Sequence, residues 1–275
     1  MKPIPFSKMS GTGNDFIIID NRDRIVENDG LAEFIRKVCR RKMSVGADGL
    51  ILIESSDKAD FRWRFFNSDG SPAEMCGNGA RCAARFACLN GIAAENLSFE
   101  TEAGIIKGQV KNGSAMVKIP DPTDLRLDYS LDLKNGPLTV SSVNTGVPHV
   151  VVMKDSVEAV DVFGLGREIR YHEAFAPSGT NVNFICRQKS GQLAIRTYER
   201  GVENETLACG TGAIASALVA FCKTNWASPI SLVTRSDESL TIHFRESNGV
   251  FTDVYLEGDA RMIYTAELRE DAWKS

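Results

Sequence analysis

The sequence CGNGA at residues 76–80 returns as CGTGA at residues 209–213, which is 133 positions further along the chain. A second pair of motifs has the same separation: TGN at residues 12–14 and TGV at residues 145–147, each just before an apolar run. Two pairs of motifs that share one offset indicate an internal duplication. The fold is therefore expected to contain two similar halves.

The same offset places FRWRF at residues 61–65 on AIRTY at residues 194–198, and it places Asn67 on Arg200. Both five-residue stretches alternate as half-buried strands do. Short apolar runs bounded by Gly, Asn or Asp predict further, buried strands. These runs are residues 17–19, 50–53 and 150–152.

Two kinds of helix are predicted. Leu31, Phe34, Ile35 and Val38 have the spacing of an amphipathic helix that packs on the outside of a sheet. The segments after the two CGxG motifs differ, because the second carries no charge from residue 213 to residue 222 and the first carries only two arginines between residues 80 and 89. Helices of this composition must be covered on nearly all sides.

An α+β architecture follows, in which each half wraps a curved mixed sheet around one central helix and the two halves face each other. Two prolines near residue 121 interrupt any strand or helix and mark the boundary. We predict an N-terminal domain at residues 1–119 with Cys76 and a C-terminal domain at residues 120–264 with Cys209. Residues 265–275 are expected to pack back on the N-terminal domain.

Composition excludes several classes of protein. The 275 residues are 43% hydrophobic and 25% charged, with a net charge of -4 and mixed signs along the chain, so a nucleic-acid partner is not expected. The longest apolar stretch, residues 213–222, spans only about 15 Å as a helix, and no signal sequence begins the chain, so neither a membrane partner nor export is expected. Seven cysteines without CxxC pairs favour a reducing cytoplasm and predict neither disulfides nor a metal site.

Cys76 and Cys209 each stand one residue before a Gly-x-Gly turn that opens an apolar helix. A helix N-terminus lowers the pKa of a thiol, and its backbone N–H groups bind anions such as a carboxylate. One thiolate is predicted to remove a proton from the α-carbon of a bound amino acid while the other thiol returns a proton to the opposite face. Such a pair titrates as a coupled system. The other cysteines, namely Cys39, Cys82, Cys88, Cys186 and Cys222, are expected to be packing residues.

Eight separated motifs carry a resemblance to a known family over nearly the whole chain. They are GTGNDF at 11–16, GADGL at 46–50, FNSDG at 66–70, MCGNGAR at 75–81, TGVPH at 145–149, TNVNF at 180–184, YERG at 198–201 and ACGTGA at 208–213. In these motifs the chain resembles the diaminopimelate epimerases. The resemblance implies a PLP-independent interconversion of LL- and meso-diaminopimelate, a step toward lysine and peptidoglycan precursors. It implies no cofactor and a small-molecule substrate, and it admits a homodimer.

The resemblance also assigns residues to roles. Cys76 and Cys209 match the two catalytic thiols. Gly77, Asn78, Gly210 and Thr211 match the loops that bind the reacting carboxylate, and Asn14, Asn67, Asn181, Glu199 and Arg200 match positions that bind the amino groups and the distal carboxylate. The chain departs from the family pattern at Val147, where many members have Asn, which removes one polar contact to the distal end.

Three alternatives remain open. A sister racemase with the same two thiols would act on another amino acid, such as histidine or proline. Val147 leaves this alternative open, because it stands where many family members have Asn. A cysteine hydrolase would pair one thiolate with His149, but it leaves the second cysteine without a role, and His149 is favoured as a packing residue. A non-catalytic module would use the two glycine-rich loops only to bind anions.

Overall fold

The computed structural model of the chain describes residues 3–274, and the chain divides into two compact units. The first unit extends to Val117 and resumes at Gly258, and the second unit comprises Lys118–Glu257. Many strands and few helices make up both units, which confirms the predicted α+β class.

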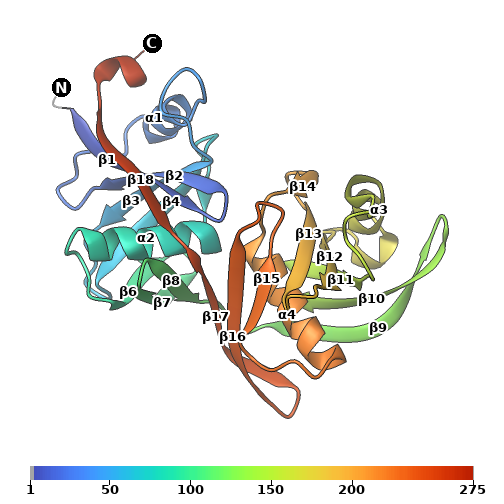
Figure 1. Cartoon of the computed structure of the whole chain (residues 1–275). Coiled ribbons are helices and arrows are strands. Elements are labelled where there is room, and N and C mark those ends of the chain that lie inside the picture. Colours follow the sequence, from blue (N-terminus) through green and yellow to red (C-terminus); the bar gives the residue numbers. More distant parts are fainter. Residues whose placement is uncertain (1–2, 275) are drawn as a thin grey trace. The chain divides into compact units, whose positions relative to one another are not determined.

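The first unit contains one mixed sheet. In order of pairing, its strands are β18 (Arg261–Leu268), β1 (Ile4–Gly11), β2 (Asn14–Asp20), β3 (Gly49–Glu54), β4 (Phe61–Asn67), β6 (Asn96–Thr101), β7 (Gly104–Lys111) and β8 (Ser114–Lys118), and the short β5 (Pro72–Ala73) also pairs with β4. The pairs β2–β3 and β4–β6 are parallel, and the others are antiparallel. The last strand, β18, lies beside the first, β1, so segments from both halves of the sequence build this sheet (Figure 1).

Alternate residues of the strands in the first unit pack on two different helices. Ile17 and Ile19 of β2 belong to one buried cluster with Leu31, Ile35 and Val38 of α1 (Leu31–Val38), so the predicted amphipathic helix is confirmed. The opposite face of the sheet lies against α2 (Gly77–Leu89), which runs along the strands (Figure 1). A short 3-10 helix, η2 (Glu270–Ala272), follows β18.

The second unit repeats this arrangement. In order of pairing, its strands are β9 (Thr123–Leu133), β10 (Gly136–Asn144), β11 (Pro148–Met153), β12 (Asn181–Arg187), β13 (Leu193–Glu199), β15 (Ile230–Val233) and β16 (Ser239–Ser247), and β14 (Asn204–Thr206) pairs with β13. The parallel pairs are β11–β12 and β13–β15, which match β2–β3 and β4–β6. The helices α3 (Val162–Arg170), η1 (Glu173–Phe175) and α4 (Gly210–Lys223) belong to this unit, and β17 (Val250–Asp259) leads back to the first.

The helices α2 and α4 are the central helices of their units. Nine residues of α2 and nine of α4 are buried, including the run from Gly212 to Ala220 without interruption. This confirms that both helices are covered nearly all round. The one charged side chain among these buried residues is that of Arg81, which is 0% exposed.

Strand registers refine the offset between the halves. Phe16 lies opposite Gly49 in the first parallel pair, and His149 lies opposite Asn181 in the second. The connection between these strands is therefore one residue shorter in the second unit, and the offset changes from 133 to 132 after it.

The next pair of strands keeps the offset of 132. Asn67, at the end of β4, therefore corresponds to Glu199, at the end of β13. The predicted match of Asn67 with Arg200 is wrong by one residue, and the match of residues 61–65 shifts with it.

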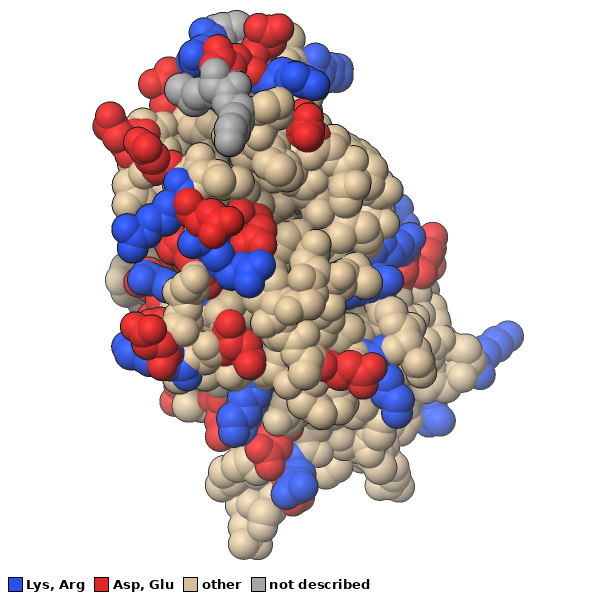
Figure 2. Space-filling model, turned by 90° about the vertical axis from the view of Figure 1, so that its left-hand side faces the viewer, with Lys and Arg blue, Asp and Glu red and all other residues tan. Residues whose placement is uncertain are grey.

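Charged side chains of both signs lie beside each other on the face shown in Figure 2, in agreement with the mixed pattern of the sequence. Among the described residues, no helix combines the length and apolar character that crossing a membrane requires. The described residues also include no group of three or more His, Cys, Asp or Glu side chains that could hold a metal ion.

Candidate functional site

Both cysteines of the repeated motif are N-caps of the central helices. Cys76 precedes α2 with an extended backbone, and its Sγ accepts a hydrogen bond from the Gly79 N–H at 3.5 Å. Cys209 precedes α4 with the same extended backbone, and its Sγ lies 3.5 Å from the Thr211 Oγ1. Both side chains are partly exposed. The predicted location at two helix N-termini is thus confirmed.

Two of the other cysteines show what burial does to a thiol in this protein. Cys82 lies within α2, is 0% exposed, and has a pKa that burial raises to about 12. Burial likewise raises the pKa of Cys39 to about 12. Thiols with such pKa values stay protonated and unreactive at neutral pH, which fits the predicted packing role.

The first turns of α2 and α4 supply backbone N–H groups without a partner inside the helix. Gly77 and Asn78 occupy the first turn of α2, and Gly210 and Thr211 occupy that of α4. The positive end of each helix dipole adds to these donors. Each turn is therefore suited to bind a carboxylate oxygen.

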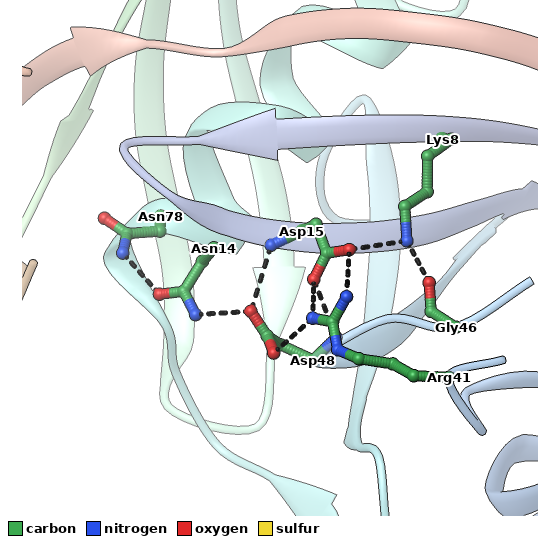
Figure 3. A network of polar contacts seen from close by, with 7 residues as sticks. All are labelled: Lys8, Asn14, Asp15, Arg41, Gly46, Asp48 and Asn78. Atoms are coloured by element: carbon green, nitrogen blue, oxygen red, sulfur yellow. Dashed lines mark hydrogen bonds and ion pairs between the residues drawn. The ribbon is translucent and has the colours of Figure 1, made fainter. Parts of the chain in front are cut away.

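Asn14 and Asn78, two of the predicted binding residues, contact each other in the first unit (Figure 3). The Asn78 Nδ2 donates to the Asn14 Oδ1 at 2.7 Å, and the Asn14 Nδ2 donates to the Asp48 Oδ2 at 2.9 Å. The β1–β2 turn therefore places its asparagine against the N-terminus of α2, beside Cys76.

Arg81, one turn further along α2, holds this end of the helix from inside the unit. Its guanidinium donates to the Thr12 Oγ1 at 2.6 Å, the Asn78 Oδ1 at 3.1 Å and the Gly77 carbonyl oxygen at 3.3 Å. It also donates to the backbone oxygen of Asp259 in β17 at 3.3 Å. Burial lowers the pKa of Arg81, but an arginine keeps its charge even so.

The side chain of Asn67 does not share in this group of hydrogen bonds within the described residues. It is exposed at the end of β4, and its side chain donates to the Ser71 Oγ at 3.1 Å within the following turn. The described residues show hydrogen bonds of Asn67 to this turn and not to Asn14 or Asn78.

In the second unit, Asn181 and Arg200 are in contact. The Asn181 Oδ1 accepts a hydrogen bond from the Arg200 backbone N–H at 2.8 Å, and the Asn181 side chain is almost fully buried. The guanidinium of Arg200 donates to the Ser178 carbonyl oxygen at 3.2 Å. Burial raises the pKa of the neighbouring Glu199 carboxyl.

A buried polar cluster in the second unit was not predicted. The Asn183 Nδ2 donates to the Val150 carbonyl oxygen at 3.0 Å and to the His149 Nδ1 at 3.1 Å, and the Asn183 Oδ1 accepts from the Thr197 Oγ1 at 3.0 Å. His149 is 1% exposed, and burial together with the charge of Arg200 lowers its pKa to about 3. The sequence signal was an asparagine within the apolar strand VNF at residues 182–184.

This cluster lies beneath the N-terminus of α4. A Cβ added at Gly212 would stand 2.3 Å from the Asn183 Oδ1, whereas a Cβ at the corresponding Gly79 would meet only carbon atoms, at 3.4 Å. The strand positions beneath α2 that correspond to His149 and Asn183 hold Phe16 and Ile51. The two halves therefore differ in what supports their central helices.

Val147 corresponds to Asn14. The residues of the second unit that correspond to Asp48 and Asn78 are Thr180 and Thr211. The hydrogen-bond chain of the first unit thus has no counterpart with the same side chains in the second.

Comparison with known proteins identifies the family. The family model described as diaminopimelate epimerase matches residues 6–120 and 141–263. The diaminopimelate epimerase of Aquifex aeolicus is 46% identical over 97% of this chain and 98% of that protein. The diaminopimelate epimerase of Archaeoglobus fulgidus is 41% identical over 97% of this chain and 96% of that protein.

Solved structures share the fold at low sequence identity. A phenazine biosynthesis protein of the PhzF family from Bacillus anthracis is 16% identical, with a TM-score of 0.76 over 98% of this chain and 100% of that one. A hydroxyproline epimerase from Agrobacterium vitis is 14% identical, with a TM-score of 0.67 over 98% of this chain and 93% of that one. The matched model and the extended identity together show that the chain belongs to the diaminopimelate epimerase family.

Proposed function

We propose that this protein interconverts LL- and meso-diaminopimelate, with Cys76 and Cys209 as paired acid and base. Membership of the family makes the chain an isomerase. The observation that carries the proposal is the duplicated arrangement of the thiols, because both copies of the fold begin their central helix with a cysteine N-cap. Both thiols are also partly exposed, unlike the fully buried Cys82, so a substrate can reach them.

The reaction removes one proton from the α-carbon of the substrate and adds another to the opposite face of that carbon. A thiolate takes the α-proton of the substrate, the C–H electron pair remains as a carbanion, and the second thiol donates its proton to the opposite face of that carbon. The first cysteine ends as a thiol and the second as a thiolate, so the protein is then ready for the reverse reaction. The mechanism requires both sulfur atoms to reach the same carbon.

The carbanion is the least stable species on this path. Backbone N–H groups of Gly77, Asn78, Gly210 and Thr211 would stabilise the charge that spreads onto the adjacent carboxylate as the proton leaves. These donors are fixed by helix geometry before substrate binds, so little reorganisation is needed.

The remaining predicted residues would bind the distal end of the substrate. The amide groups of Asn14, Asn67 and Asn181 and the guanidinium of Arg200 suit a carboxylate, and the carboxylate of Glu199 suits an ammonium group. A substrate charged at both ends uses all of these groups. This supports diaminopimelate over an amino acid with one carboxylate.

We further propose that the protein acts in the cytoplasm, in the formation of lysine and peptidoglycan precursors, without PLP or another cofactor, and that it forms a homodimer. The cysteine content of the sequence supports a reducing compartment. Size-exclusion chromatography with light scattering tests the dimer.

The substrate is tested by proton NMR in D2O with reduced enzyme free of metal and PLP. We expect loss of the α-proton signal of LL-diaminopimelate and appearance of the meso isomer. The Cys76→Ser and Cys209→Ser variants should each react ~10²–10⁴-fold more slowly, since each lacks one of the two proton-transfer groups. Exchange of proline or histidine instead would assign the protein to the sister racemases. Exchange of no amino acid would contradict the proposal and favour the anion-binding module.

A further inference from the structure

A directed chain of hydrogen bonds runs from the interior of the first unit to its edge. The Arg81 guanidinium donates to the Asn78 Oδ1, the Asn78 Nδ2 donates to the Asn14 Oδ1, and the Asn14 Nδ2 donates to the Asp48 Oδ2. The three distances are 3.1, 2.7 and 2.9 Å. Figure 3 shows the last two of these contacts, with both asparagines on one side of Asp48.

The two ends of this chain set its direction. A guanidinium can only donate hydrogen bonds, and an ionised carboxylate can only accept them. Turning either asparagine amide by half a turn would place its oxygen against another oxygen, or its NH2 group against another donor. Each amide therefore has one stable orientation, and that of Asn14 is set by direct contact with Asp48 on one side and through Asn78 by Arg81 on the other.

Asp48 is itself held on its other side by charges. Its Oδ1 accepts from the Arg41 guanidinium at 2.9 Å, and its Oδ2 also accepts from the Asp15 backbone N–H at 3.1 Å. Asp15 in turn pairs with the Lys8 ammonium at 2.7 Å and with Arg41 at 2.5 Å, and these contacts hold the pKa of Asp15 down, at about 2, against the effect of its burial. Figure 3 shows the whole network, in which the Lys8 ammonium also donates to the Gly46 carbonyl oxygen.

The fold does not require this chain of contacts. The second unit has the same strands and the same central helix, but it holds Val147, Thr180 and Thr211 at the positions of Asn14, Asp48 and Asn78. These side chains form a directed chain of hydrogen bonds in one copy of the duplicated fold and are absent from the other. Packing of the fold therefore does not explain their presence.

We propose that Asp48 is a positioning residue for the substrate, which acts by fixing the amide orientation of Asn14. This inference rests on the proposed function, which assigns Asn14 and Asn78 to substrate binding. With the chain in place, Asn14 keeps one N–H and one oxygen lone pair for the substrate, and Asn78 keeps one N–H. The fixed orientation determines which side of Asn14 offers the donor.

The test is a double-mutant cycle between Asp48 and Asn14, measured as KM and kcat for LL-diaminopimelate. Asp48→Asn keeps the shape of the side chain but replaces an acceptor by a group that is partly a donor. We expect it to raise KM about 10-fold, equivalent to about 1.4 kcal/mol, with kcat within threefold, because the lost contact holds substrate and transition state alike. In the Asn14→Ala background, Asp48→Asn should change KM by less than twofold.

Asp20→Asn is the matched control. It makes the same change at a carboxylate that is 37% exposed and pairs with Arg22, outside the chain of contacts, so KM should stay within twofold of the wild-type value. Thermal unfolding of every variant reports on folding. If Asp48→Asn does not fold, Asp48→Thr replaces it, since the second unit already accommodates Thr180 at this position.

Two results would overturn the inference: an Asp48→Asn variant with unchanged KM, or effects of the two substitutions that multiply in the double variant. An unchanged KM in Asn14→Ala alone would remove its premise and overturn it as well. Failure of the proposed function looks different, because wild-type protein would then exchange no α-proton of diaminopimelate at all.

Discussion

His149 is a residue whose local surroundings fix its chemical state. The Asn183 Nδ2 donates to the Val150 carbonyl oxygen, which accepts only, so the same amide nitrogen must also be the donor toward the His149 Nδ1. The proton of the neutral ring then lies on Nε2. The low pKa, about 3, means that the ring stays neutral in the folded protein throughout the physiological pH range.

This state makes folding depend on pH. The folded pKa of His149 lies below its ordinary value of 6.5, so below pH 6.5 the unfolded chain takes up a proton that the folded protein refuses. Above pH 6.5, His149 is neutral in both states and does not affect the free energy of unfolding. Below pH 6.5, it lowers the free energy of unfolding by up to about 1.4 kcal/mol per pH unit as the pH falls toward 3. We expect His149→Phe, which copies Phe16 of the first unit, to reduce the pH slope of the free energy of unfolding between pH 6 and 4 by about one proton.

Urea unfolding at several pH values measures this slope. His172→Phe is the control, because His172 is only partly buried and caps a short 3-10 helix. Equal slopes in wild type and His149→Phe would show that His149 is protonated in the folded protein, contrary to its burial.

At the residue scale, the sequence predicted those site residues that belong to a repeated or family-like motif, such as Cys76 and Cys209. It did not predict the partners that orient them. Asp48 and Asn14 are 34 positions apart, and Arg81 and Thr12 are 69 apart, so their contacts depend on how the strands pair. Two arginines in an otherwise uncharged helix were visible in the sequence, but the burial of Arg81 and its hydrogen-bond partners were not.

At the scale of elements, the two central helices begin alike but rest on different supports. Gly79 of α2 lies over the side chains of Phe16, Ile51 and Trp63, whereas Gly212 of α4 lies over Asn183. Glycine is required at Gly212 because the helix approaches a side chain that three hydrogen bonds hold in place.

We therefore expect opposite outcomes from the same substitution in the two helices. Gly212→Ala brings a Cβ to 2.3 Å from the Asn183 Oδ1 and should lower the free energy of unfolding by about 1–3 kcal/mol. Gly79→Ala creates only ordinary contacts, at 3.4 Å, and should be neutral or stabilising by up to about 1 kcal/mol through helix propensity.

Denaturant unfolding of both variants checks this difference. Asn183→Ala in the Gly212→Ala background should recover part of the loss, because it removes the atom that the new Cβ meets. Equal costs at the two glycines would contradict the role given to Asn183.

The elements themselves were well predicted because hydrophobic periodicity is a local property. The spacing of Leu31 to Val38 gave α1, and three apolar runs gave β2, β3 and β11. The alignment between the halves was wrong in the middle strands, since a one-residue change in the connection between parallel strands leaves no mark on periodicity. Only the strand register reveals it.

At the scale of the whole molecule, the first unit is built from two segments that are far apart in the sequence. β18 pairs with β1 along its length, and Leu268 joins Ile4 and Phe6 in the buried cluster beneath α1. The first unit can therefore fold completely only after β18 has been synthesised. Such a contact between distant parts of the chain raises the loop-closure cost of folding.

Leu268→Ala should lower the free energy of unfolding by about 2–4 kcal/mol, because it removes a buried side chain from this cluster. Ile263→Ala on the same strand should cost less than about 1 kcal/mol, because Ile263 is 53% exposed. Urea denaturation compares the two variants. A similar cost for both would mean that β18 contributes by strand pairing alone and not through the cluster.

The central claim is that two thiols share the proton transfer. The most direct test measures whether solvent deuterium first appears in the meso product or in the remaining LL substrate. In D2O, at low conversion, LL-diaminopimelate and its meso product are separated and the deuterium at each α-carbon is measured by mass spectrometry. With two bases, the group that donates to the product carries solvent deuterium while the other holds the proton taken from the substrate. We predict one deuterium in nearly every meso molecule and almost none in the remaining LL isomer. Deuterium in both isomers from the earliest times would show that one group serves both faces, and it would contradict the account.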